Sequence, residues 1–456
     1  MNQILWKNIE QFSFDTVLSD YGFETRLASE NAWTKKFTKK ALLEYKKFMY
    51  LAATSNTMVS PSEIVDIVWH QHLIFSKSYR EFCQILGKNV QHIPSTHNEA
   101  EFETFQKAKM HTTRLYKENF GEQPKEIWEY RDMYAPLGLR KAKIDITVNL
   151  IIGLIAFFML ANPAYYLLLP TYQTIGNPLF LQTYVIFFML AFVFLNLFNQ
   201  YYLANFIKKA PKFSFLHHLE ALELIYMKTK KLDDVIHANL NKLLHKKTIT
   251  VNSDDTLKLQ DENEPKNVEE YATFKSLQRL GNTYYPVLLK ELLPKPTFQN
   301  VANSVTSFRK HFTQSKFFMS LFSLNLICLT VLLMLGFVRL LAGINHQKPI
   351  LFISMTMFVF TVATIYFLWR LTQIAFTRTI PQFYISTVLP KKQQISDLEL
   401  SYFVIGSSIL AADFLPLVTY TQKNNSAVAS SCGTCGSSCG SSCGGGCGGG
   451  CGGCGG

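Results

Sequence analysis

The last 27 residues of the chain, 430–456, hold seven of its nine cysteines in a stretch of Gly and Ser. These thiols are Cys432, Cys435, Cys439, Cys443, Cys447, Cys451 and Cys454. Neighbours are three or four residues apart, so adjacent sulfurs can turn toward one ion, and Gly imposes little steric restraint on such turns. Thiolates bind Zn(II), Cu(I) and iron–sulfur centres. The pattern therefore predicts a tail that captures a soft metal, Zn or Cu(I).

Two other interpretations of this tail stay open. A low-complexity Gly/Ser segment is typical of a flexible linker, in which Cys is only tolerated. The thiols are also candidate substrates for lipidation or another modifying enzyme. In either case the chain would be a membrane scaffold, and its tail an extension without a metal.

A second set of candidate ligands lies near residue 70. Asp66 and His70 are four residues apart, so a helix brings both to one face. His72 falls on the apolar stripe of the same helix, as a core histidine would. A metal site at Asp66 and His70 needs a third ligand to fold back onto them. The candidates for that ligand are His92, His97 and His111. A structural i,i+4 pair is the alternative, and a metal-dependent enzyme using Asp66, His70 and His92 is a further one.

Apolar residues recur with helical period through residues 1–143, which predicts a soluble helical domain. One amphipathic helix is expected at residues 37–53. The next helix is expected to begin with Ser60 as its N-cap and Pro61 as its first residue, and to run without a break to Gly87. This second helix would carry Asp66, His70 and His72.

Four uncharged apolar runs are each long enough to cross about 30 Å of hydrocarbon as a helix. They are residues 146–169, 179–201, 317–338 and 349–369. A fifth stretch, residues 403–420, is shorter and contains Asp413 and Pro416, so we expect it to be interfacial or packed against protein. Residues 144–201 and 317–369 thus predict two pairs of transmembrane helices.

Basic residues set the expected orientation, because Lys and Arg are retained on the cytoplasmic side. They flank one end of the spans and are Arg140, Lys141, Lys143, Lys208, Lys209, Lys212, Arg309, Lys310, Lys316, Arg370 and Arg378. The loops at the opposite end carry only Lys348, with Arg339 close by. We therefore expect a multi-pass protein with both termini in the cytoplasm. Juxtamembrane attraction to anionic lipid accounts for the net charge of +12 without nucleic acid.

The loop at residues 202–316, called the loop module below, is expected to form a small cytosolic unit. Residues 216–227 and 233–244 predict two helices, and residues 248–259 predict two short strands joined by a polar turn. This order resembles half of a winged helix. Because acidic residues offset the basic ones on its second helix, a surface for protein partners is favoured over one for nucleic acid. Residues 370–425 are expected to be a cytosolic or interfacial segment.

A resemblance covers about residues 30–130. The residues that carry it are Asp66, Trp69, His70, Tyr79, Phe82, Cys83, Gly87, His92, Pro94, Tyr116, Phe120, Gly121, Pro124, Ile127 and Trp128. In this pattern the chain resembles the glycine-rich domain-containing protein-like family, although it has Gln91 and His92 where family members carry two histidines. The remainder resembles an uncharacterised group of bacterial membrane proteins with a Gly/Cys tail. The resemblance implies the bacterial inner membrane and no established activity.

The sequence therefore predicts a mainly α protein. It combines a helical N-terminal domain, a polytopic region of four helices in two pairs, a small winged-helix-like module and a disordered C-terminal tail. No Gly-rich phosphate loop, nucleophile elbow or HExxH occurs in it. Binding to a metal or to protein partners is thus favoured over catalysis.

Overall fold

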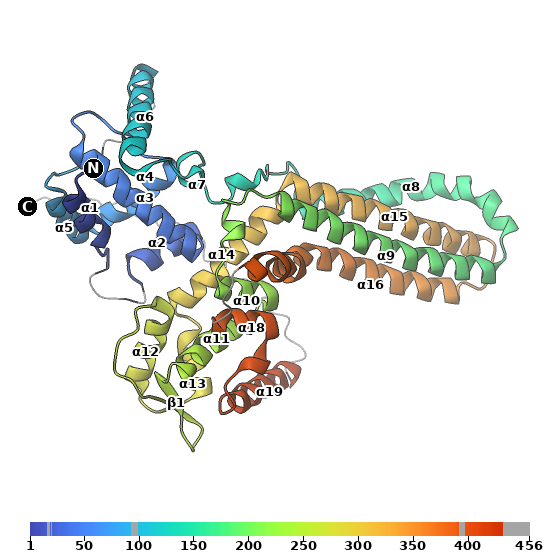
Figure 1. Cartoon of the computed structure of the whole chain (residues 1–456). Helices are drawn as coiled ribbons and strands as arrows, with labels where there is room; N and C mark the ends of the chain where they lie inside the picture. The colour runs from blue at the N-terminus through green and yellow to red at the C-terminus, as the bar shows by residue number, and fades with distance from the viewer. Residues whose placement is uncertain (16–18, 20, 93–98, 392–396, 432–456) are drawn as a thin grey trace, which may run out of the picture.

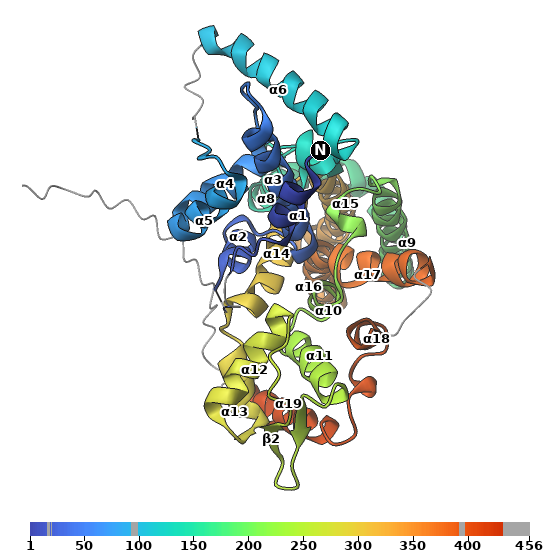
Figure 2. The same cartoon turned by 60° about the vertical axis from the view of Figure 1, so that its left-hand side comes forward.

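The computed structural model describes residues 1–15, 19, 21–92, 99–391 and 397–431. Within these residues the protein is mainly helical, with one three-stranded sheet. Figure 1 shows four long helices side by side, with two compact helical lobes gathered at one end of them. Figure 2 shows the two lobes, one above the other, in front of that bundle. The predicted fold class is confirmed.

The N-terminal lobe comprises residues 1–143. Its helices are α1 (Gln3–Gln11), α2 (Phe23–Asn31), α3 (Lys35–Thr54), α4 (Glu63–Ile74), α5 (Ser76–Leu86), α6 (Glu99–Phe120) and α7 (Lys125–Trp128). The predicted helix at residues 37–53 is α3, which begins after Thr34, whose hydroxyl accepts a hydrogen bond from the amide of Phe37. Its apolar stripe faces α4, and Tyr45 and Phe48 are fully buried there.

Two details of the next predicted helix were wrong. Ser62, and not Ser60, is the N-cap of α4, because its hydroxyl accepts the amide hydrogen of Val65 at 3.2 Å. The amide of Ser60 instead donates to the hydroxyl of Thr112. The helix also breaks at Phe75, whose ψ of 60° separates α4 from α5. The stop at Gly87 is confirmed, since this residue ends α5 with a left-handed φ of 69°.

The four predicted spans are confirmed as long apolar helices. They are α8 (Ile146–Thr174), α9 (Asn177–Lys209), α15 (Lys316–Asn345) and α16 (Leu351–Ile374). Helix α15 packs against the other three. Gly336 permits its close approach to α9 and α16, because a Cβ there would lie 2.5 Å from the hydroxyl of Tyr184 and 2.3 Å from the sulfur of Met357. By length and composition, these four helices mark a protein inserted in a membrane.

A buried polar contact ties two of the spans together. Asn199 on α9 and Asn325 on α15 exchange two side-chain hydrogen bonds of 2.8 and 2.9 Å. In hydrocarbon such a pair satisfies two amides that would otherwise be costly to bury. The pair therefore joins α9 to α15 inside the bundle.

The loop module contains helices and a small sheet. Its helices are α10 (Ala221–Thr229), α11 (Leu232–His245), α12 (Val268–Leu280), α13 (Tyr285–Leu292) and α14 (Pro296–Thr313). Its strands are β1 (Ile249–Val251), β2 (Thr256–Leu259) and β3 (Thr283–Tyr284). The predicted order of helix, helix and hairpin is present, with Ile249 opposite Leu259 in the β1–β2 pair. The sequence did not suggest β3, which adds two residues antiparallel to β2.

The chain after the fourth span returns to the loop module. It forms α17 (Ile380–Phe383), α18 (Leu398–Ile405) and α19 (Leu415–Ser431). Helix α18 packs on α10 and α11, and α19 contacts α13. Phe403, Phe414 and Val418 are buried in these contacts. Residues 403–420 are therefore packed against protein, one of the two expected possibilities, and the predicted disordered tail lies outside the described residues beyond 431.

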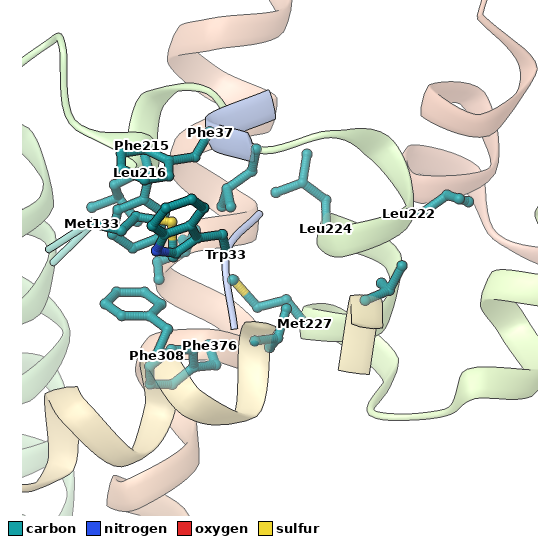
Figure 3. Packing of buried hydrophobic residues seen from close by; sticks show 14 of the residues in the cluster. Trp33, Phe37, Met133, Phe215, Leu216, Leu222, Leu224, Met227, Phe308 and Phe376 are labelled. Carbon is teal, nitrogen blue, oxygen red and sulfur yellow. The ribbon is translucent and has the colours of Figure 1, made fainter. Parts of the chain in front are cut away.

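The N-terminal lobe and the loop module share an apolar core. Figure 3 shows Trp33, Phe37 and Met133 of the lobe close to Phe215 and Phe308 of the loop module. Polar contacts join the same two parts: the ammonium group of Lys35 pairs with Glu269, and the amide of Lys35 donates to Glu223. The N-terminal lobe and the loop module therefore form one packed assembly.

Candidate metal centre

Helix α4 presents two of the predicted ligands on one face. Asp66 lies in the first turn of α4, after the Ser62 cap, and His70 lies one turn later. The Nδ1 atom of His70 is 3.2 Å from a carboxylate oxygen of Asp66 and 2.9 Å from its backbone oxygen. This is the i,i+4 arrangement expected from the sequence.

The third side chain comes from the segment that follows α5. The Nε2 atom of His92 is 2.9 Å from Oδ1 of Asp66, and the rings of His70 and His92 lie 4.3 Å apart. Of the two candidate histidines that the structure describes, His92 folds back onto Asp66. His111 instead contacts the hydroxyl of Thr57 at 2.6 Å, and His97 lies outside the described residues.

Packing beneath the site holds His92 in place. The indole of Trp69 contacts the His92 ring edge-on, with a centroid distance of 4.6 Å. The Trp69 Nε1–H donates to the hydroxyl of Tyr79 at 3.1 Å, and that hydroxyl donates to the backbone oxygen of Val90. Since Val90 is two residues before His92, this chain of contacts fixes the segment that carries the imidazole.

The three groups have the spacing of a ligand set. One ligand atom from each of Asp66, His70 and His92 lies within 4.8 Å of the other two. A zinc ion bound at about 2.0–2.1 Å to each of two tetrahedral ligands keeps them roughly 3.3 Å apart. The distances to Asp66 are close to this value: Nε2 of His92 lies 2.9 Å from Oδ1, and Nδ1 of His70 lies 3.2 Å from the other carboxylate oxygen. Within the described ranges, no other group of three His, Cys, Asp or Glu meets the same criterion.

The three ligands line a cleft of about 890 Å³. Its other walls come from the loop after α3 and from the turn around Lys88. The ammonium group of Lys88 donates to the backbone oxygens of Ala52 and Ser55, at 3.0 and 3.1 Å, so its charge is directed to the end of α3. The exposed side-chain fractions are 13% for His92, 37% for Asp66 and 56% for His70. A solute can therefore reach the site, while His92 stays anchored.

His72 has a different role from His70. It is fully buried, its Nδ1 atom lies 2.9 Å from the hydroxyl of Tyr45, and its Nε2 atom lies 3.1 Å from that of Ser78. Burial lowers the pKa of His72 from 6.5 to about 4. The interpretation of His72 as a satisfied core histidine is thereby confirmed.

The seven cysteines predicted to bind metal, residues 432–454, lie outside the described residues. The two other cysteines, Cys83 and Cys328, are free thiols that lie in α5 and α15. Sequence reasoning named all three residues of the cleft site but missed the support that Trp69 and Tyr79 give it. The spacing of ten residues between those two aromatics offered no helical-face signal, because the break at Phe75 lies between them.

Comparison with known proteins adds one match. Residues 6–116 match the model of the UCP032817-like family, and this segment includes the whole candidate site. The matched segment is under a quarter of the chain, so it describes a similarity of the N-terminal lobe. Searches of curated proteins and of solved structures gave no match. The lobe is thus similar to an uncharacterised family, and the four long apolar helices indicate a membrane protein.

Proposed function

We propose that the protein is a membrane-anchored receptor for transition-metal ions, with a binding site at Asp66, His70 and His92. The observation that supports it is the meeting of one carboxylate and two imidazoles from separate segments within 4.8 Å in a solvent-accessible cleft. Neutral imidazole and carboxylate together suit Zn(II) and similar borderline ions.

Three protein ligands leave one coordination position of a tetrahedral ion for water or for a ligand of a partner. Such a position permits exchange, because an incoming group can bind before the ion leaves. The exposed side chain of His70 faces the cleft and is the ligand that is most easily displaced. The proposed role is therefore reversible binding and transfer of an ion, in contact with a protein partner.

The Cys-rich tail belongs to the same proposal. It follows α19, the last described helix, which packs against α13 of the loop module. Its thiolates suit Zn(II) and Cu(I), and about four of them complete one tetrahedral set. A cytoplasmic tail would keep its thiols reduced, and the Lys and Arg residues beside the near ends of the spans support that side. The membrane in the proposal is the bacterial inner membrane.

The test is elemental analysis of protein purified in detergent under reducing conditions, dialysed after loading with zinc. The comparison is between the full chain, a chain without residues 430–456, and the shortened chain carrying His92→Ala or His70→Ala. His111→Ala is the matched control, because it removes a histidine from the same lobe outside the ligand set. We expect one zinc per shortened chain, at least tenfold less in the His92 and His70 variants, and no loss in the control.

Two results would contradict the proposal for the cleft: no zinc on the shortened chain, or equal zinc in all three histidine variants. Circular dichroism of each variant shows whether the helices are intact. If neither the cleft nor the tail retains metal, the scaffold interpretation, with the tail as a linker or a modification substrate, takes its place.

The tail is tested separately as the peptide 430–456. Any single Cys→Ser change should cost little affinity, because six thiols still provide a set of four. Ser at Cys432, Cys435, Cys439 and Cys443 together leaves three and should weaken binding sharply. Cobalt titration under reducing conditions reports this through thiolate-to-metal absorption bands. Free alkylation of all seven thiols in the presence of zinc would contradict metal capture by the tail.

A further inference from the structure

The far end of the four-helix bundle, where α8 turns into α9 and α15 is joined to α16, contains a second cavity. All four spans contribute to its walls, and its volume is about 450 Å³. Leu169, Leu181 and Ile353 give it apolar surface, and Arg339, His346 and Lys348 give it basic groups. It is thus open to both the apolar layer and the polar boundary of a membrane.

The positive charge in this cavity has no acidic partner. Residues 146–209 and 316–374, which contain the four spans and both far loops, include no Asp or Glu at all. Arg339 is only 9% exposed, and in the described part of the chain it forms no ion pair. Burying a cation without a counter-charge is costly, which makes the missing negative group significant.

Arg339 is oriented, but its charge is only partly offset. Its guanidinium donates to the backbone oxygens of Tyr172 and Ile175 and to the side-chain oxygen of Asn177. The backbone oxygens belong to the last turn of α8 and its cap, where the helix dipole contributes about half a negative charge. The rings of Tyr172 and Phe180 lie 5.4 and 5.1 Å from the guanidinium carbon and add a weak cation–π attraction. With Lys348 on the same wall, a net positive charge is left over.

We propose that this cavity binds the phosphate group of an anionic phospholipid, with an acyl chain against the apolar wall. Charge complementarity selects the headgroup, because Arg339 and Lys348 leave a positive charge that a phosphate group offsets. The apolar wall selects a lipid over a soluble anion. Arg339 positions the α8–α9 loop at one side of the headgroup, and Lys348 supplies the more accessible charge.

The test uses the full chain in detergent, incubated with equal amounts of phosphatidylglycerol and phosphatidylcholine, with retained lipids counted by native mass spectrometry. Lys348→Gln removes an exposed charge, and Lys258→Gln is its matched control, because this exposed lysine lies on β2 of the loop module, outside the spans and the loops that join them. One Lys near the membrane is worth about a fivefold change in anionic lipid binding. We expect phosphatidylglycerol retention to fall about fivefold for Lys348→Gln and to be unchanged for Lys258→Gln.

A second variant tests the cavity itself. Gln173→Trp adds a bulky ring to an exposed position of the wall and leaves the charge unchanged. It should also lower retention, because the ring occupies space that the lipid needs. Equal retention of both lipids by the wild type, equal effects of Lys348→Gln and Lys258→Gln, or full retention by Gln173→Trp would each overturn the proposal. Displacement of the lipid by millimolar inorganic phosphate would overturn it in favour of a soluble anion.

Discussion

The N-terminal cleft and the far end of the bundle both gather nitrogen-bearing side chains, but only the cleft adds a carboxylate. In the cleft, Asp66 lies within 3.2 Å of two imidazoles, one from its own helix and one from a returning segment. At the far end, Arg339 and Lys348 have no Asp or Glu in either loop or in the spans. The first arrangement suits a cation and the second an anion. The presence of one carboxylate therefore determines the sign of the charge on the expected ligand.

The two regions also differ in how their groups are held. In the cleft, helix α4 and the ring of Trp69 hold the ligands, while at the far end oxygens from the end of α8 and the start of α9 surround one guanidinium. A buried aromatic ring stabilises through apolar area, and an oriented cation stabilises through electrostatics in a low dielectric. Substitutions in the two regions should accordingly differ in kind as well as in size.

The largest loss of stability is expected for Trp69→Ala, which removes the indole that packs beneath His92 in the cleft. Trp69 is buried and contacts Phe48, Tyr79 and His92. Loss of a core Trp typically costs about 3–5 kcal/mol. Hydrogen exchange of the α4 amides would measure this loss, with the exposed Trp369→Ala as a control that leaves α4 unchanged. Unaltered protection of α4 in Trp69→Ala would show that the cleft does not depend on this indole.

A smaller loss of stability is expected at the Asn199–Asn325 pair, which lies between the two regions and joins two neutral side chains. Asn325→Leu leaves the Asn199 amide unsatisfied, which costs about 1–2 kcal/mol. The double variant with Asn199→Leu should cost less than the sum of the single variants, because neither amide is then left alone. Thermal unfolding of the wild type, the two single variants and the double variant in detergent measures how strongly the two amides stabilise each other. Strict additivity would mean that the two amides do not stabilise each other.

The position of Asp66 depends on where α4 begins, and this can be tested with two serines. Ser62→Ala should destabilise α4 by about 1 kcal/mol, because its hydroxyl caps the amide of Val65. Ser60→Ala should have almost no effect, since Ser60 contributes its backbone amide to Thr112. Thermal unfolding of the two variants side by side is sufficient. A larger loss for Ser60→Ala would restore the start predicted from the sequence.

The smallest effect concerns the interface that joins the N-terminal lobe to the rest. Burial raises the pKa of Glu223 from 4.5 to about 8 and that of Glu399 to about 7. The folded protein thus keeps protons that the unfolded chain releases, so stability should fall as pH rises from about 4.5 to about 8. His72, with its pKa lowered to about 4, acts in the opposite direction between pH 4 and 6.5.

Because the two carboxyls outweigh the single imidazole between pH 4.5 and 6.5, these groups together predict stability that falls from about pH 5 to about pH 8. Melting temperatures between pH 5 and 9 would measure it. Glu223→Gln carries no titratable proton and should flatten the alkaline side of the profile. A Glu223→Gln profile parallel to that of the wild type would mean that this carboxyl does not control the interface.

Much of the fold was predictable because its signals are local. Continuous apolar runs identified the four spans, and helical periodicity identified α3, α10 and α11. The cap at Ser62 was missed because Ser60 and Pro61 form an equally good local signal, and only the contact of Ser60 with Thr112 distinguishes them. Strand β3 was missed because two residues are too few to show the alternation of apolar and polar side chains that marks a strand.

The candidate site was predictable in part for the same reason. Asp66 and His70 share a helix, so their spacing determined their common face. His92 was one of three possible partners, and the choice depends on the contacts of Trp69 and Tyr79, which are made across the break at Phe75. The lack of Asp and Glu around Arg339 can be seen in the sequence. The burial of Arg339 against the end of α8 is a tertiary property that the sequence does not show.

X-ray absorption at the zinc edge would show whether Asp66, His70 and His92 bind a metal ion. The sample is the chain without residues 430–456, loaded with zinc and dialysed, so that no tail thiol contributes. We expect nitrogen and oxygen ligands at about 2.0–2.2 Å, with the outer-shell signal of imidazole, and loss of the spectrum in His92→Ala. A sulfur shell at about 2.3 Å, an unchanged spectrum in His92→Ala, or no retained zinc would contradict metal binding by these three residues.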